Sequence, residues 1–124
     1  MSADRIFIFI GAILGFLGVA LGAFGAHFLK SRLSPEMLAV FETGVKYHLI
    51  HALALLITAW IAAQYPYPLI RLSGWLFFAG VLIFSASLYL LATTGVKAWG
   101  AVTPIGGLLL LAGWLSLAIG IAKG

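Results

Sequence analysis

Charged residues are scarce in this sequence. Asp, Glu, Lys and Arg make up 8% of its 124 residues, against about 25% in an ordinary soluble domain. The seven basic residues are scattered along the chain, so the net charge of +4 does not mark a nucleic-acid-binding surface. This composition excludes a water-soluble enzyme and a nucleic-acid-binding protein.

Cysteine is absent altogether. Its absence excludes disulfide bonds, thiolate metal sites and cysteine nucleophiles, although it does not identify a cellular compartment. A metal site would therefore have to use the three histidines and a carboxylate.

Long uncharged runs are what the sequence has instead. They cover 6–29, 47–70, 72–96 and 98–122, and 64% of all residues are hydrophobic. A helix that crosses the hydrocarbon core of a bilayer needs about 20 apolar residues, so every run is long enough. The sequence predicts an all-α membrane protein with a single transmembrane domain over residues 1–124. It is a compact four-transmembrane-helix bundle with helices at about 6–28, 47–64, 72–94 and 98–122.

The first run has an alternative interpretation as a secretory signal peptide. The apolar region of a signal peptide is usually about 7–15 residues long, whereas this run continues from Ile6 to about Phe28. We therefore expect it to be the first transmembrane helix.

The segment 35–45 is typical of a short amphipathic helix. Ser34 suits an N-cap and Pro35 suits the first helical position. Its apolar residues recur at helical spacing and its charged residues lie on other faces: Leu38, Phe41 and Val45 against Glu36, Glu42 and Lys46. We expect an interfacial helix between the first and second crossings. Gly44 could bend the chain there, or the two helices could be continuous.

Glycines recur at heptad-like spacing in two of the runs. The first run has them at Gly11, Gly15, Gly18, Gly22 and Gly25, and the last run has them at Gly106, Gly113 and Gly120. Such spacing places small residues on one stripe of a helix, where another backbone can approach closely. We expect two helix-packing seams, and the functional alternative is a groove for a lipid tail or a sliding contact.

Polar residues gather at one end of the second run. The group consists of His27, Glu42, Lys46, Tyr47, His48 and His51. Three histidines and a carboxylate could bind a transition metal or form a proton relay, and the plainer alternative is a hydrogen-bonded cluster that fixes the helices. On one straight helix His48 and His51 share a side that Glu42 does not, so convergence would need a bend at Gly44. The sequence identifies no catalytic, cofactor or metal residue.

The last run leaves its starting point open. The helix begins either near Ala98 or at Pro104. Trp114 lies near its middle, where we expect packing rather than interfacial anchoring. Four crossings put both termini on the same side of the membrane, but the basic residues are divided too evenly to orient the chain.

Several strings, in this order, resemble the YgdD-like family of small bacterial inner-membrane proteins, which is related to a eukaryotic four-helix transmembrane family. They are GAFGAH at 22–27, ETGVKY at 42–47, HALALL at 51–56, SASLYLL at 85–91 and TPIGG at 103–107. Phe28 and Ala86 stand where the family pattern has glycine. The resemblance covers essentially the whole chain and implies a four-helix integral membrane protein. It supplies no catalytic residues, and it draws attention to His27, Glu42, Tyr47, His51 and Pro104.

We therefore expect a non-enzymatic, multi-pass protein of the bacterial inner membrane, with no cofactor. Its expected partners are membrane lipids and either a second copy of the chain or a larger membrane complex, and nucleic acid is excluded. The alternative is a small oligomeric transporter or channel that uses the region of His27, Glu42 and His51.

Overall fold

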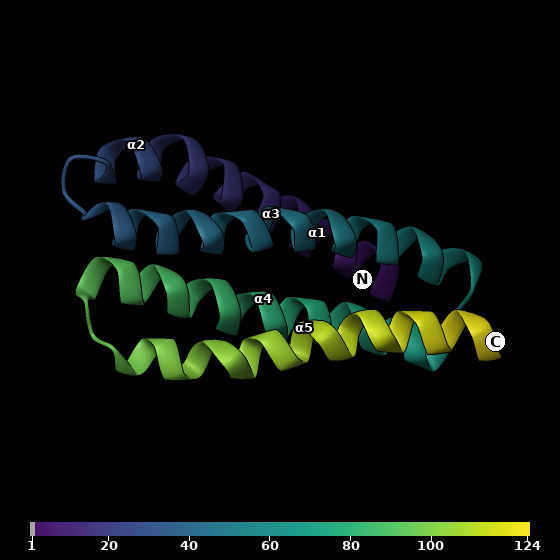
Figure 1. The fold of residues 1–124 in the computed structure, drawn as a ribbon. Helices are drawn as coiled ribbons and strands as arrows, with labels where there is room; N and C mark the ends of the chain where they lie inside the picture. Colours follow the sequence, from purple (N-terminus) through teal and green to yellow (C-terminus); the bar gives the residue numbers. More distant parts are fainter. Residues whose placement is uncertain (1) are drawn as a thin grey trace.

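Four long helical segments make up the computed structural model, which describes residues 2–124 (Figure 1). They are α1 (Ala3–Ala20) continued by the π-helical turn η1 (Leu21–Gly25) and α2 (Ala26–Leu29), then α3 (Pro35–Gln64), α4 (Pro68–Thr94) and α5 (Ala98–Lys123). Each of the four is long and apolar enough to cross a membrane. The prediction of an all-helical protein with four spans is confirmed.

The prediction of a separate interfacial helix at 35–45 is wrong, because α3 runs without a break from Pro35 to Gln64. Its start is as expected: the Ser34 hydroxyl accepts a hydrogen bond from the Met37 backbone N–H at 3.2 Å. Thirty residues extend for about 45 Å, longer than the roughly 30 Å hydrocarbon core. The amphipathic segment therefore lengthens the second crossing.

Gly44, where a bend was considered, lies within the unbroken α3. It is buried against α4, where a Cβ atom on Gly44 would lie 2.8 Å from the ring of Tyr89. Its carbonyl oxygen also accepts a hydrogen bond from the Ser85 hydroxyl at 2.8 Å. Gly44 thus allows α3 and α4 to pack closely at this position.

The helices pack in the order of the sequence, with α1 on α3, α3 on α4 and α4 on α5. Within residues 2–124, no Cα atom of α5 comes within 8 Å of one in α1 or α3. The two termini and the α3–α4 loop lie at one end of the molecule, and the other two loops lie at the opposite end, which we call the loop end (Figure 1). The result is a row of helices with open sides.

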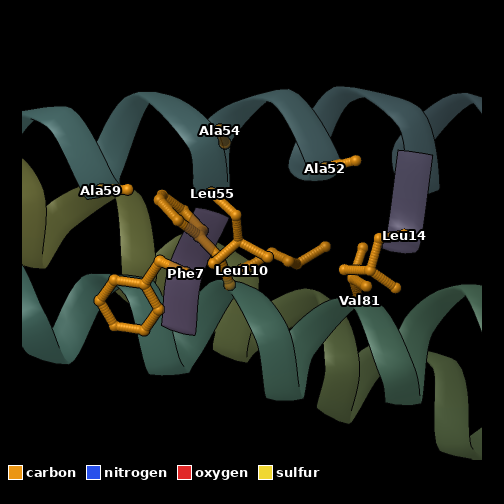
Figure 2. Close-up of a cluster of buried hydrophobic side chains, with 9 residues drawn as sticks. Phe7, Leu14, Ala52, Ala54, Leu55, Ala59, Val81 and Leu110 are labelled. Atoms are coloured by element: carbon orange, nitrogen blue, oxygen red, sulfur yellow. The ribbon is translucent and has the colours of Figure 1, made fainter. Parts of the chain in front are cut away.

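Two apolar clusters hold this row together. The larger one lies between α3 and α4 and is completed by side chains from α1 and α5 (Figure 2): Phe7, Leu14, Ala52, Ala54, Leu55, Ala59, Phe77, Val81 and Leu110. The smaller one lies towards the loop end and consists of Phe41, Val45 and Ala92. The first cluster lies beside the two buried histidines of α3.

Candidate functional site

The polar residues singled out from the sequence fall into two groups. His48 and His51 are buried in the helix row, at 5% and 3% exposure. The others are exposed: His27 on α2, and Glu42, Lys46 and Tyr47 on α3. The uninterrupted α3 keeps Glu42 on a different face from the histidines, as expected for a straight helix. The structure therefore does not bring His27 and Glu42 together with His51.

His48 links three helices. Its Nδ1 lies 2.8 Å from the hydroxyl of Tyr89 on α4, and its Nε2 lies 2.8 Å from the backbone carbonyl oxygen of Leu14 on α1. A carbonyl oxygen only accepts, so Nε2 carries the hydrogen and Nδ1 accepts from the hydroxyl. Gly18 makes room for this contact, because a Cβ atom there would lie 3.2 Å from Cδ2 of His48. Both ring nitrogens are thus engaged in holding helices together.

His51 links α3 to α5. Its Nδ1 lies 2.8 Å from the Tyr47 carbonyl oxygen, and its Nε2 accepts the indole N–H of Trp114 at 3.0 Å. The carbonyl fixes the hydrogen on Nδ1, which leaves Nε2 free to accept. A second proton on this ring would place two donors face to face, so the contact requires a neutral imidazole. Trp114 therefore contacts α3 and α4 through one edge of its indole, although 45% of the side chain stays exposed at the side of the molecule.

A lateral groove of about 580 Å³ lies between α3 and α5 beside this contact. We call it the α3–α5 groove, and it is lined by Tyr47, His51, Phe84, Pro104, Gly107, Leu108, Leu110, Leu111 and Trp114. Trp114 also lines a second hollow of about 380 Å³ that continues towards the terminal end. The indole thus divides the space between the two helices into two parts.

A smaller apolar hollow of about 310 Å³ lies between α1 and α4. His48 and Tyr89 line it, together with Leu14, Val81 and Ser85 among others. The Tyr89 hydroxyl bonds to Nδ1 of His48, and Nε2 of His48 bonds to the Leu14 carbonyl oxygen, so the hollow presents carbon surface. It belongs to the helix junction around His48.

Glycines from both predicted seams lie at helix contacts. In α1 and η1, Cβ atoms on Gly11, Gly18, Gly22 and Gly25 would meet side chains or backbone of α3, whereas Gly15 faces open space. In α5, Gly106, Gly113 and Gly120 all face α4. Seven of the eight glycines lie at such helix contacts.

Sequence reasoning missed Tyr89 as part of the polar network. A tyrosine hydroxyl buried in a helix core needs a partner, and that need is the signal that could have identified it. Other hydroxyls in the spans bond locally or to a neighbour, as Ser87 and Thr103 do at 2.6 Å. Within residues 2–124 no buried side-chain nitrogen or oxygen lacks a hydrogen-bond partner, and no three potential metal-ligating side chains converge.

The row of apolar spans, whose buried polar side chains are all hydrogen-bonded within residues 2–124, defines a small multi-pass helical membrane protein. The chain belongs to the family described as "Protein of unknown function (DUF423)", whose model matches residues 21–107. The resemblance to the YgdD-like family is thereby confirmed, since that family corresponds to this one.

Similar proteins are bacterial. The chain is 41% identical to the UPF0382 membrane protein YwdK of Bacillus subtilis over 96% of this chain and 98% of that protein. It is 44% identical to the UPF0382 membrane protein SH2409 of Staphylococcus haemolyticus over 96% of this chain and 97% of that protein. No solved structure matches the chain. The protein is therefore a bacterial multi-pass membrane protein with four candidate spans.

Proposed function

We propose that the protein is non-catalytic and acts through the contacts that its helices make within the bilayer, with lipids and with other membrane proteins. The observation that carries this proposal is the use of the two buried histidines. Each has both ring nitrogens bonded to groups that hold neighbouring helices or helix turns, so neither has a nitrogen left to act on a substrate.

The open sides of the helix row support the same proposal. The backbone of α5 lies close to that of α4 but not to that of α3, which leaves the α3–α5 groove accessible from the side of the molecule. A lateral opening in a spanning protein faces acyl chains and other transmembrane helices, because those are its neighbours in the bilayer. The α3–α5 groove is therefore suited to contact with acyl chains and with other transmembrane helices.

Crosslinking in native membranes, followed by blue-native electrophoresis in mild detergent, tests the proposal. We expect the protein to migrate with bound lipid or as a complex larger than its 13.2 kDa monomer. A solitary monomer that retains neither lipid nor protein would contradict it.

The alternative of a small transporter or channel has less support. His27 and Glu42 are exposed outside the α3–α5 groove, and His51 lies in its wall with both nitrogens engaged. A flux assay in proteoliposomes compares the two ideas directly. Flux that is lost in His51→Ala and kept in His27→Ala would favour transport through the groove and oppose the non-catalytic proposal.

A further inference from the structure

We propose that the α3–α5 groove holds one acyl chain of an anionic phospholipid taken from the leaflet at the loop end. This inference rests on the proposed function, because it names the class of ligand that the open side of the row would bind. It specifies which groove is occupied, from which leaflet the lipid comes and which charge its headgroup carries.

The groove has the size and chemistry of an apolar ligand site. Its volume of about 580 Å³ lies within the roughly 300–1,000 Å³ range of small-molecule pockets. Its walls are mostly hydrocarbon, with Leu108 and Leu111 on α5 facing Phe84 of α4 and the ring of Tyr47 on α3. No part of residues 2–124 covers it, so in a bilayer the neighbouring lipid chains would fill it.

The length of the groove matches one leaflet. Its lining along α5 runs from Pro104 to Trp114, which corresponds to about 15 Å of helix. Half of the roughly 30 Å hydrocarbon core is the same distance. An acyl chain that enters the groove near Pro104 would therefore reach the middle of the bilayer near Trp114.

Trp114 supplies the inner end of the site. Its indole spans the gap between the helices, with its N–H on His51 at 3.0 Å and its ring 4.8 Å from that of Phe77. Because the N–H is engaged, the indole turns a carbon surface towards the groove. The same ring also lines the second hollow beyond it, so the indole marks the boundary between the groove and that hollow.

Charge at the loop end favours an anionic headgroup. This end carries four basic residues against two acidic ones: Lys30, Arg32, Lys46 and Lys97 against Glu36 and Glu42. The terminal end has the same excess of two basic residues, so the leaflet follows from the position of the groove and the charge concerns the headgroup alone. Lys46 directly precedes Tyr47 of the groove wall, and Lys97 lies at the start of α5, about two turns before Pro104. Both lysines are exposed, so their ammonium groups are free to meet a lipid phosphate.

Groove filling tests the acyl-chain site. A Cβ atom on Gly107 would lie 3.8 Å from the Phe84 ring, an ordinary contact, so Gly107→Leu should fold while occupying the groove. Gly15→Leu is the matched control, because a Cβ atom on Gly15 has no neighbour within 4 Å and Gly15 does not line the groove. Native mass spectrometry of the full chain in mild detergent with dipalmitoyl phosphatidylglycerol measures the bound lipid.

We expect Gly107→Leu to lower phospholipid retention about tenfold, and Gly15→Leu to leave it unchanged. Leu111→Trp, which fills the same groove from a different position, should act like Gly107→Leu. Equal retention by the wild type and both groove-filling variants would overturn the inference. So would a crosslinked dimer that Gly107→Leu abolishes, because the groove would then hold a second copy of the chain.

The headgroup is tested by removing charge at one end. The double variant Lys46→Gln with Lys97→Gln should lose the preference for phosphatidylglycerol over phosphatidylcholine, and Arg71→Gln with Lys123→Gln at the terminal end should keep it. A wild type that retains both lipids equally would overturn the anionic part of the inference. If the proposed function itself failed, the wild type would retain neither lipid nor a partner protein, and this result differs from a failure of the lipid site alone.

Discussion

The two sides of α5 differ in how closely another helix approaches. Towards α4, its three glycines Gly106, Gly113 and Gly120 lie where a Cβ atom would meet the neighbouring helix, and the first would overlap the backbone of Phe84. Towards α3, Trp114 makes a hydrogen bond and a ring contact with His51, and open space lies on either side of it. Helices in lipid approach closely where small residues meet. Because α5 presents its three packed glycines to α4, larger side chains such as Leu108 and Leu111 stay exposed, and they line the groove.

The largest effect is expected from Phe77→Ala. Phe77 is fully buried on α4, and a Cβ atom on Gly113 of α5 would lie 2.7 Å from its ring. Removing the ring should lower the free energy of unfolding by about 3–5 kcal/mol, because it empties the closed side of α5. Unfolding by SDS titration in mixed micelles, followed by circular dichroism, gives the value. A loss as small as that of an exposed control such as Phe16→Ala would mean that the α4–α5 contact does not hold α5.

Two adjacent glycines, Gly106 and Gly107, lie on the two different sides of α5. Gly106→Ala should destabilise by about 1–3 kcal/mol, because its methyl group would push α5 away from the Phe84 backbone. Gly107→Ala should change stability little, since its methyl group reaches Phe84 only at 3.8 Å. The same unfolding titration compares them, and equal losses would contradict the difference between the two sides.

The junction around His48 extends the comparison to α3. Tyr89→Phe removes the hydroxyl that donates to Nδ1 of His48 and leaves that buried acceptor without its partner. We expect a loss of about 1 kcal/mol, within the range of side-chain hydrogen bonds in membrane proteins. Tyr65→Phe, on a half-exposed ring after α3, is the control and should be neutral. An effect of equal size in the two variants would argue that the hydroxyl bond contributes nothing.

The smallest effect is expected on the open side. Trp114→Phe removes the hydrogen bond to His51 but keeps an aromatic ring beside Phe77. The expected loss is about 0.6 kcal/mol, the average for such bonds between transmembrane helices. A loss greater than that of Gly106→Ala would show that the α3–α5 contact is the stronger one.

The sequence predicted the spans because charge is excluded from hydrocarbon and the charged residues, except Glu42 and Lys46 inside α3, lie near helix ends or in loops. It did not predict which helix each glycine would face. Gly15 has the same spacing as Gly11 and Gly18 but meets open space, since spacing defines a stripe and not its neighbour. The continuity of α3 was left open for the same reason: the contact of Gly44 with Tyr89 joins residues far apart in the chain.

The polar site was less predictable than the spans. His48 and His51 were identified, but their partners Tyr89 and Trp114 lie 41 and 63 residues further along the chain. Such pairs depend on which helices become neighbours, and one sequence does not encode that in any local pattern. The π-helical turn η1 was also missed, although two glycines within five residues weaken an α-helix there.

Fluorescence of Trp114 gives the most direct test of the claim that the α3–α5 groove opens to lipid. The variant Trp60→Phe, Trp75→Phe and Trp99→Phe leaves Trp114 as the single tryptophan, and phosphatidylglycerol brominated late or early in its acyl chain reports contact by quenching in vesicles. We expect strong quenching by the lipid brominated deep in the chain, weaker quenching by the one brominated near the headgroup, and none by aqueous iodide. Quenching by iodide would contradict the account, because it would mean that water fills the groove.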